Sequence, residues 1–420
     1  MLTEKGKRDK DIIIGLDVGT TKICAVVGKM TRYGLDILAV SSHPSNGLRK
    51  GVVVDIEAAA ESIKGAISKA NYQTGLNIRK VIVGISGSHI KSFKGSGAVG
   101  IRGKRVAYED IEMAIDSAEA SYVPLDRETL HVISFDFILD GRAGIKEPVG
   151  MAGSRLEVNA HIITGDAASV HNLLMSCEKA GLEVMDIALE PIASSEAVTD
   201  FYEKDAGIAI IDIGGGTTDI AVYKDGWLRL VSGLGIGGSH FTNDISLVLE
   251  MPFQQAEEIK KSSSVLPDIE DDVDIDLDSK DGCSISVSRK RIAEIMQPRA
   301  EELLELVKKE MQMVYNNEIS VLEAVLTGGA SLIKGIDRVA EEILSMPVRI
   351  GYPQLNSQGK AFKVSRLRND FNSPGYAAGI GLVLCGAENI ISENEFISTQ
   401  NVFDSIIDKM AGWFKRGSNV

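Results

Sequence analysis

Two short segments in distant parts of the chain share an arrangement of glycine, threonine and aspartate residues. Residues 15–22 read GLDVGTTK, and residues 212–219 read DIGGGTTD. Glycine has no side chain to keep backbone N–H groups away from phosphate oxygens, and threonine hydroxyls can donate further hydrogen bonds. Apolar, strand-like runs flank both segments, so we expect two strand–turn–strand units. Two such turns can face each other across a cleft and hold one polyphosphate between them.

Charged residues within these segments indicate how a polyphosphate would be held. Lys22 offers a positive point charge for a phosphate. Asp17 and Asp212 can only accept hydrogen bonds and would repel a polyanion, so we expect them to hold Mg²⁺, through its water shell. A single turn of this kind could equally belong to an ordinary β-hairpin. Two copies, together with a further glycine turn that reads GGAS at residues 328–331, favour nucleotide binding.

Length and composition describe an ordinary globular chain of more than one domain. The 420 residues are too many for one small core, and 44% of them are hydrophobic. The net charge of −14 argues against broad nucleic-acid binding, which needs a basic face. The four cysteines form no C-x-x-C and the histidines form no H-E-x-x-H, so neither disulfides nor a zinc site is expected.

The sequence also gives an expectation about the compartment. The first residues lack the apolar core of a signal peptide, and no apolar run approaches the roughly 20 residues that span a bilayer. Scattered cysteines fit a reducing environment. We therefore expect a cytoplasmic protein.

Hydrophobic periodicity divides the chain into two α/β lobes with additional parts. We expect a first lobe at 11–85 and 163–200, an inserted α+β subdomain at 86–162, a second lobe at 201–239 and 301–375 with an outer subdomain at 240–300, and a return to the first lobe at 376–387. A flexible tether at 388–400 and an amphipathic helix at 401–416 follow. The acidic residues 268–278 alternate with apolar ones, which favours one strand of a hairpin turning at 279–282 over a calcium loop, because the EF-hand spacing is absent.

The last segment has the pattern of a helix with one apolar face. At about 100° per residue, its large apolar residues fall within an arc of roughly 140°. The helix could dock onto the rest of the protein, but it follows a polar tether and ends in basic residues, which favours a membrane surface with anionic headgroups. The residues expected to contact the membrane are Phe403, Ile406, Ile407, Met410, Trp413, Phe414, Lys415 and Arg416. One such helix should bind weakly, and many copies in a polymer should bind with high avidity.

The two glycine turns and the third turn resemble the actin-like ATPase superfamily, which includes actin, DnaK-type chaperones, sugar kinases and bacterial filament proteins. The resemblance implies an actin-like fold with two lobes around an ATP-binding cleft. The phosphate contacts it implies are Gly19, Thr20, Thr21 and Lys22 in the first turn and Gly214, Gly215, Gly216, Thr217 and Thr218 in the second; Gly237 and Gly238, which begin the next helix, are further candidates. Gly328, Gly329 and Ala330 would lie against adenosine.

Two further motifs carry over from this superfamily. AEEIK at 256–260 resembles a helix of the filament proteins, so Glu257 and Lys260 are candidates for contacts to the base or ribose, unless they lie on a solvated charged face. LEPIA at 189–193 resembles the turn that positions the attacking water, which makes Glu190 the candidate catalytic acid beside Asp17 and Asp212. Glu190 could also simply stabilise a helix N-terminus, and both readings can hold together.

Within the superfamily, the chain resembles the FtsA family of bacterial cell-division proteins over nearly its whole length. The specific marks are KEPVGMAG at 146–153, LHVI at 130–133, and the segments 191–198 and 292–299. The resemblance implies that the tail of the tubulin-like protein FtsZ binds the subdomain at 240–300, and Arg299 matches an arginine implicated there. Alternatively, Arg299 is a surface arginine without a partner. Residues 268–278 are more acidic than the family pattern, and FtsZ tails are themselves partly acidic.

These observations predict an ATP-binding, filament-forming adaptor that anchors the FtsZ ring to the cytoplasmic face of the bacterial inner membrane at the division site. ATP would close the cleft and favour polymerisation, with hydrolysis slow or absent. The inserted subdomain would contact other copies and other division proteins, and no nucleic-acid partner is expected. Two alternatives share the cleft: a PilM-like pilus-assembly protein, which should lack the terminal helix, and a sugar or acetate kinase, which needs a substrate acid–base motif that we do not find.

Overall fold

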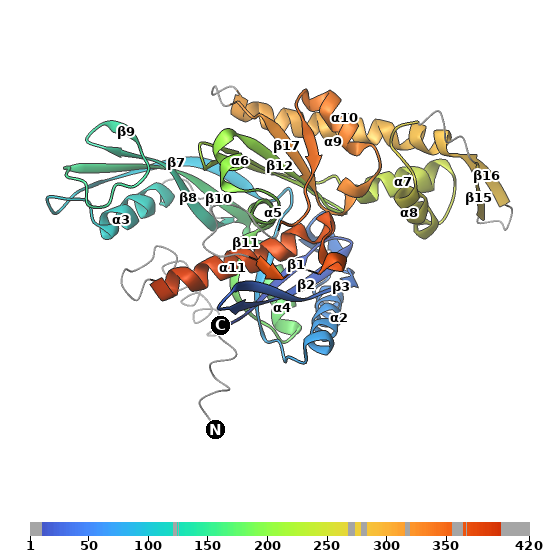
Figure 1. Cartoon of the computed structure of the whole chain (residues 1–420), viewed down its shortest axis with the longest axis horizontal. Coiled ribbons are helices and arrows are strands. Elements are labelled where there is room, and N and C mark those ends of the chain that lie inside the picture. Colours follow the sequence, from blue (N-terminus) through green and yellow to red (C-terminus); the bar gives the residue numbers. More distant parts are fainter. Residues whose placement is uncertain are drawn as a thin grey trace.

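The computed structural model describes residues 11–120, 124, 126–267, 274–278, 284–315, 320–354, 364–366 and 368–395. Its described part contains two α/β lobes, an inserted subdomain and an outer subdomain (Figure 1). The expected amphipathic helix at 401–416 lies outside the described residues. Among the helices that are described, none is long and apolar enough to cross a membrane.

The first lobe is built on a six-stranded sheet with the order β11-β6-β1-β2-β3-β19. Its strands are β1 (Ile12–Val18), β2 (Lys22–Thr31), β3 (Gly34–Pro44), β6 (Lys80–Ile85), β11 (Glu183–Leu189) and β19 (Val364–Arg366). The first three strands form an antiparallel meander, and β1 pairs in parallel with β6. Helices α2 (Ile56–Thr74) and α4 (Ala167–Lys179) pack together on one side of the sheet, and α11 (Ala377–Glu395) packs on the other (Figure 1).

The second lobe has a five-stranded sheet with the order β14-β13-β12-β17-β18. Its strands are β12 (Ile208–Ile213), β13 (Thr218–Lys224), β14 (Trp227–Leu234), β17 (Glu323–Thr327) and β18 (Val348–Ile350), and β12 and β13 form an antiparallel hairpin. Helices α9 (Arg289–Tyr315) and α10 (Ile336–Leu344) cover it on the outside (Figure 1). The outer subdomain consists of α7 (Gly238–Val248), α8 (Phe253–Ser262), β15 (Asp274–Asp278) and β16 (Ser284–Ser288).

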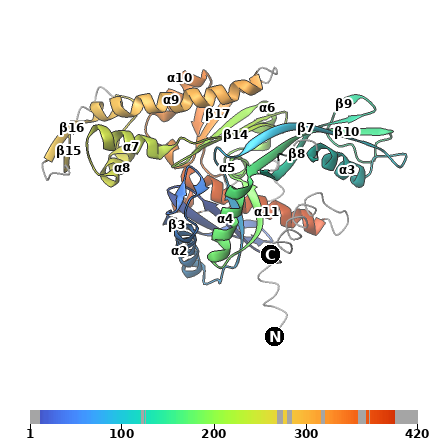
Figure 2. The ribbon, with the colours of Figure 1, turned by 180° about the vertical axis from the view of Figure 1, so that it is seen from behind.

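The inserted subdomain has its own small core. Its four-stranded antiparallel sheet has the order β7-β10-β8-β9, from β7 (Lys91–Gly100), β8 (Arg127–Leu139), β9 (Arg142–Ile145) and β10 (Arg155–Asp166). Helix α3 (Tyr108–Glu119) packs so closely on β7 that a β-carbon at Gly97 would lie 2.0 Å from the carbonyl oxygen of Ala114. Both ribbon views place this subdomain and the β15–β16 hairpin at opposite ends of the molecule (Figures 1 and 2).

Helices α5 (Glu190–Val198) and α11 cross closely where the two lobes meet. Helix α5 contacts β6 and β11 of the first sheet and β12 and β13 of the second, and α6 (Phe201–Ala206) follows it. Where α5 crosses α11, a β-carbon at Gly381 would lie 1.8 Å from the carbonyl oxygen of Ala193. Native β-carbons do not approach other atoms this closely, so only glycine fits at this crossing without a shift of one helix.

The structure bears on two predicted segments. Residues 274–278 of the acidic stretch form a strand, as predicted, since β15 pairs antiparallel with β16 from Asp274–Ser288 to Asp278–Ser284. Residues 268–273 and the turn predicted at 279–282 lie outside the described residues. In contrast, the tether predicted from residue 388 is wrong in its first part, because α11 continues to Glu395. No glycine or proline follows Gly386 in this helix, so the chain has no residue there that would end it.

Candidate nucleotide-binding site

The two glycine turns face each other across the boundary between the lobes. The first joins β1 to β2 and is closed by the Gly19 N–H, which donates to the Lys22 carbonyl over 3.1 Å; the second joins β12 to β13 and is closed in the same way from Gly214 to Thr217 over 2.9 Å. A β-carbon at Gly216 would lie 2.5 Å from the Thr20 hydroxyl oxygen. At Gly215 it would lie 2.4 Å from the Thr21 hydroxyl oxygen. The turns therefore abut so closely that only glycine fits on the second.

The start of α7 supports the second turn from behind. The N–H groups of Gly238 and Ser239 donate to the carbonyls of Gly214 and Gly215 over 2.9 Å and 2.7 Å. A β-carbon at Gly237 would lie 2.7 Å from the Gly214 carbonyl oxygen, so the helix can approach the turn only because this residue is glycine. Thus Gly237 and Gly238 hold the second turn in position.

The residues expected on the adenosine side come together beside Gly238. The Lys260 ammonium, on the buried face of α8, donates to the Gly238 carbonyl (3.1 Å), the Thr242 hydroxyl (3.0 Å) and Glu257 (2.6 Å). A β-carbon at Gly238 would lie 3.0 Å from that of Ala330. Lys260 is only 7% exposed, so the reading of α8 as a solvated charged face is wrong for this residue.

Burial and pairing oppose each other in the Glu257–Lys260 pair. Burial lowers the pKa of Lys260 even though Glu257 lies beside it. Burial alone would raise the pKa of Glu257, but hydrogen bonds from Lys260 and Thr242 outweigh it and leave that pKa lowered. Through its bonds to Gly238 and Thr242, the pair links α8 to the start of α7.

The third glycine turn leads from β17 into the short helix η1 (Gly329–Leu332). Gly328 has φ = +83°, and a β-carbon there would lie 2.2 Å from Asp212 Oδ1. Its N–H donates to the Pro374 carbonyl over 3.2 Å. A β-carbon at Gly329 would meet no atom within 4 Å, so this turn presents its backbone to open space next to Asp212.

Lys22 is held by a segment that our sequence analysis did not assign to the site. Its ammonium donates to the Gly375 carbonyl and lies 4.5 Å from the centre of the Tyr376 ring. Both residues belong to the short helix η3 (Pro374–Tyr376), which immediately precedes α11. The Pro374-Gly375 pair is a turn signal that was available in the sequence, but nothing local connects it to Lys22.

Four carboxyl groups lie together behind the two turns: Asp17, Glu190 and Asp219 are buried, and Asp212 is half-buried. Burial, opposed by Lys22 and reinforced by Asp212, raises the pKa of Asp17 to about 6. Burial and the charge of Asp212 raise the pKa of Asp219 to about 7. Burial followed by the charges of Asp17 and Asp219 raises the pKa of Glu190 well above its ordinary value, and burial also raises the pKa of Asp212. The positive charge of Lys22 thus does not offset burial, and the ionised forms of these acids are disfavoured.

Each acid is fixed by a different element. Asp212 accepts a hydrogen bond from Ser194 of α5, and Asp219 accepts one from the Gly87 N–H over 3.0 Å. Glu190 is the first residue of α5, and a β-carbon at Gly84 would lie 2.8 Å from its Oε1. Glu190 therefore both begins a helix and lies beside the acidic cluster, and its catalytic role stays a prediction. Asp219 was visible in the motif but was not assigned a role.

The part of the chain that the structure describes contains no group of three or more His, Cys, Asp or Glu side chains placed to hold a metal ion directly. Asp17 and Asp212 nevertheless lie close enough for the charge of Asp212 to raise the pKa of Asp17. Two neighbouring carboxylates suit a hydrated Mg²⁺, which keeps several of its waters and takes one or two carboxylates. The donor set therefore fits the predicted ion.

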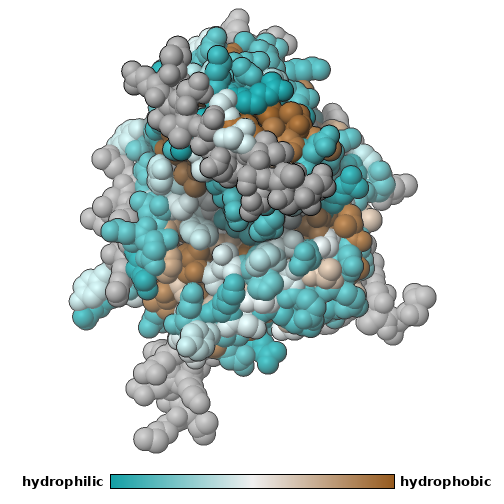
Figure 3. Space-filling model, turned by 90° about the vertical axis from the view of Figure 1, so that its right-hand side faces the viewer, coloured by the Kyte–Doolittle hydropathy of each residue, from teal (hydrophilic) through white to brown (hydrophobic). Residues whose placement is uncertain are grey.

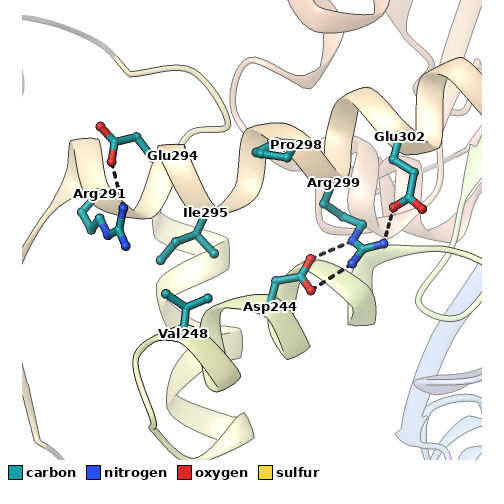
Figure 4. Close-up of a pocket in the computed structure, with 8 residues that line it drawn as sticks. All are labelled: Asp244, Val248, Arg291, Glu294, Ile295, Pro298, Arg299 and Glu302. Carbon is teal, nitrogen blue, oxygen red and sulfur yellow. Dashed lines mark hydrogen bonds and ion pairs between the residues drawn. The ribbon is translucent and has the colours of Figure 1, made fainter.

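Arg299 lies apart from this site, in a groove between α7 and α9 of the outer subdomain. Its guanidinium makes two parallel bonds to Asp244, from Nε (2.7 Å) and Nη2 (3.0 Å), and a further bond to Glu302 (Figure 4). Arg299 is therefore paired within the chain, and whether it also binds a partner protein stays a prediction. The groove has a volume of about 400 Å³ and is lined by Asp244, Val248, Arg291, Glu294, Ile295, Pro298, Arg299 and Glu302.

Seen from the end that carries the outer subdomain, the surface is mainly hydrophilic with separate apolar areas (Figure 3). Exposed apolar side chains of α7 and α8 include Leu247, Val248 and Phe253. Val248 and Ile295 face each other from α7 and α9, beside the Arg291–Glu294 ion pair (Figure 4). The groove thus combines apolar contact area with charged groups at its edges.

Comparison with known proteins identifies the family. A family model described as "Cell division protein FtsA" matches residues 209–381, and one described as "SHS2 domain inserted in FTSA" matches residues 87–164. The protein of that name from Pseudomonas aeruginosa is 39% identical over 90% of this chain and 89% of its own length. The chain belongs to the FtsA family.

Two further proteins of the same name match over most of this chain. The Escherichia coli K12 protein is 32% identical over 97% of both chains, and the Bacillus subtilis protein is 33% identical over 91% of this chain and 84% of its own. Family membership makes this an actin-like cell-division protein and favours that prediction over the pilus-assembly and kinase alternatives.

Solved structures confirm the actin-like fold. The PilM-PilN type IV pilus biogenesis complex matches with a TM-score of 0.63 at 19% identity, over 89% of this chain and 98% of that one. MreB5 of Spiroplasma citri bound to ADP matches with a TM-score of 0.53 at 16% identity, over 93% and 99% of the two chains. At these identities the likeness shows the fold alone.

Proposed function

We propose that this member of the FtsA family binds ATP in the cleft, assembles into filaments, and tethers the FtsZ ring to the cytoplasmic membrane at the division site. The observation that carries the ATP-binding step is the pair of abutting glycine turns, with threonine hydroxyls and Lys22 at the phosphate side and four acids behind them. The solved MreB5 structures, which share this fold, contain ADP or AMPPNP.

In this proposal each part of the site has a separate task. The N–H groups of the two turns and the hydroxyls of Thr20, Thr21, Thr217 and Thr218 bind phosphate oxygens. Gly328, Gly329 and Ala330 lie along adenosine, with the Glu257–Lys260 pair at its far side. Asp17 and Asp212 hold the water shell of Mg²⁺, which would supply the positive charge that ionised carboxylates and phosphates both require.

Glu190 is our candidate for orienting the attacking water. Burial, followed by the charges of Asp17 and Asp219, raises its pKa well above the ordinary value, which disfavours the ionised form that could accept a proton. This direction supports slow turnover, because added positive charge near Glu190 would favour its ionised form. Closing of the cleft by ATP, rather than hydrolysis, would then drive assembly.

The test of this function is nucleotide binding by the intact chain. We expect ATP with Mg²⁺ to raise the thermal unfolding temperature, because a ligand at a hundredfold excess over its Kd stabilises the folded state by about 2.7 kcal/mol. Removing Mg²⁺ with EDTA should reduce the shift. Unchanged unfolding temperature with millimolar ATP, supported by absence of binding in equilibrium dialysis, would contradict the proposal.

We place the FtsZ tail in the groove that contains Arg299. A peptide with both apolar and acidic residues would lay its apolar side chains on Val248 and Ile295, and its carboxylates would compete with Asp244 for the guanidinium. Arginine suits such a role because its planar group binds carboxylates in a bidentate manner. The acidic β15 strand lies in the same subdomain, so the groove rather than the hairpin is the expected contact.

Arg299→Ala should weaken binding of an FtsZ tail peptide by about tenfold or more, the loss expected for a charge-assisted bidentate contact of roughly 1.4 kcal/mol or more. Asp244→Asn should bind at least as tightly as the wild type, because it frees the guanidinium. Arg338→Ala, at a different surface, is the control of equal charge. Fluorescence anisotropy with a labelled peptide measures the affinity of all three variants. Equal affinity of Arg299→Ala and the wild type would show that the tail does not bind in this groove.

The remaining parts of the proposal concern other surfaces. The inserted subdomain, at the opposite end from the outer subdomain, would contact neighbouring copies and other division proteins (Figure 2). The helix at 401–416 would lie in the membrane surface, so that the protein is peripheral. This helix lies outside the described residues, and it therefore rests on its sequence pattern alone.

A further inference from the structure

A short hairpin that the sequence analysis did not anticipate lies against both phosphate turns. Strands β4 (Leu48–Arg49) and β5 (Val52–Val53) pair through Arg49 and Val52, which leaves Lys50 and Gly51 as a two-residue turn. Both have positive φ, +52° for Lys50 and +78° for Gly51. Such turns favour Asn-Gly, because residues other than glycine and asparagine rarely adopt this conformation. A lysine here is therefore unusual and calls for a reason.

The turn contacts elements of both lobes at once. The Gly51 N–H donates to the Thr20 hydroxyl over 2.9 Å, which ties the hairpin to the first phosphate turn. A β-carbon at Gly51 would lie 3.1 Å from both the Thr217 methyl carbon and the Ser86 carbonyl oxygen. The Lys50 side chain extends over the second lobe, where its Cδ would lie 3.4 Å from a β-carbon at Gly235.

The order of contacts along the second phosphate turn shows which end of the site the hairpin occupies. Gly214 contacts the start of α7, next to Gly238 and Ala330. Gly215 and Gly216 follow and face Thr21 and Thr20, and Thr217, the last residue, faces Gly51. With adenosine beside Gly238 and Ala330, as proposed above, the phosphate chain therefore runs toward the hairpin.

The position of Glu190 agrees with this direction. Ser86 makes a hydrogen bond to Glu190, and its carbonyl lies beside Gly51. The candidate acid for a water attacking the terminal phosphate is thus next to the hairpin. Two independent sets of contacts place Lys50 at the terminal-phosphate end.

The charges in the site leave Lys50 available for a ligand. Four acids, three of them buried, lie behind the turns, and Lys22 is already held by the Gly375 carbonyl and the Tyr376 ring. Lys50 is exposed and makes no hydrogen bond or ion pair with any residue in the described ranges. We propose that the Lys50 ammonium binds the terminal phosphate of a nucleoside triphosphate and makes the site prefer ATP to ADP. This inference rests on the proposed nucleotide-binding function.

The test compares Kd values for Mg-ATP and Mg-ADP in the full chain. Lys50→Asn removes the charge and suits the left-handed turn, so loss of folding is not expected. We expect this variant to raise the Kd for Mg-ATP about tenfold, which corresponds to roughly 1.4 kcal/mol. The Kd for Mg-ADP should stay within about twofold of the wild-type value. Lys50→Arg, which keeps the charge, should retain most of the preference. Arg49→Asn, the same change of charge one residue earlier, should alter neither Kd.

Each other outcome overturns the assignment. An unchanged ratio of the two Kd values in Lys50→Asn removes the terminal phosphate as the ligand, whether or not both affinities fall. If Arg49→Asn raises the Kd for Mg-ATP as much as Lys50→Asn does, the loss reflects the overall charge near the site and not a contact of Lys50 with the phosphate. If the wild-type chain binds neither nucleotide, the proposed function fails instead; wild-type binding with no selective effect of Lys50→Asn defeats this inference alone.

Discussion

Replacing Gly216 with valine should abolish ATP binding while the chain remains folded. A β-carbon at this position already lies 2.5 Å from the Thr20 hydroxyl oxygen, and the two valine methyl groups would fill the space in which a phosphate must approach the backbone N–H groups. We expect the Kd for ATP to rise at least a hundredfold, about 2.7 kcal/mol. Equilibrium binding of a fluorescent ATP analogue measures the change.

The matched control is Gly100→Val, in β7 of the inserted subdomain. A β-carbon there would meet no atom within 4 Å, so the same substitution should be tolerated and leave ATP binding intact. Circular dichroism of both variants checks the fold. Wild-type affinity in Gly216→Val would show that ATP, if bound, does not lie between the two turns, and the site would have to be sought elsewhere.

Ending the chain at Glu395 should abolish its sedimentation with vesicles that contain anionic phospholipid. This end point keeps α11 whole and removes the tether and the amphipathic segment. The apolar face of that segment and its terminal Lys415 and Arg416 match the chemistry of a lipid surface, and a polymer would add avidity. We expect the full chain to sediment with vesicles, more completely with ATP than without it.

Point variants separate membrane contact from other effects of truncation. Trp413→Asp with Phe414→Asp places charges on the apolar face and should release the full chain from vesicles. Asp404→Asn, off that face, should not weaken binding. Equal sedimentation of the truncated and full chains would show that another part of the chain binds the membrane. If neither chain sediments with vesicles, the proposed membrane binding is wrong.

Local sequence signals predicted the parts of the site that depend on neighbouring residues. The glycine turns between apolar strands could be recognised because their residue types and their flanking strands are adjacent in sequence. Their pairing across the lobes followed from having two copies. The acidic hairpin strand was also predictable, since alternation of apolar and polar residues has the period of a strand.

The residues that were missed are brought to the site by contacts between distant segments. Lys50 lies in a hairpin with two residues per strand, too short to give a periodic pattern. Gly375 reaches Lys22 across more than 350 positions, and Asp219 gains its environment from Gly87 in the crossing to the inserted subdomain. Burial of Lys260 against the first turn of α7 likewise depends on how two helices pack, which their own sequences do not specify.

Helix α5 connects the two lobes through contacts on both of its faces. Since no methyl group fits between Gly381 and Ala193, α5 packs tightly on α11, which itself packs on the first sheet. The other face of α5 meets the second sheet, where Ile210 and Val325 belong to the same apolar core as Val198. Two hydrogen bonds add to this contact, from Ser194 to Asp212 and between Ser195 and the Tyr223 hydroxyl over 2.9 Å. An acid of the candidate nucleotide site is therefore bonded directly to the helix that packs against both lobes.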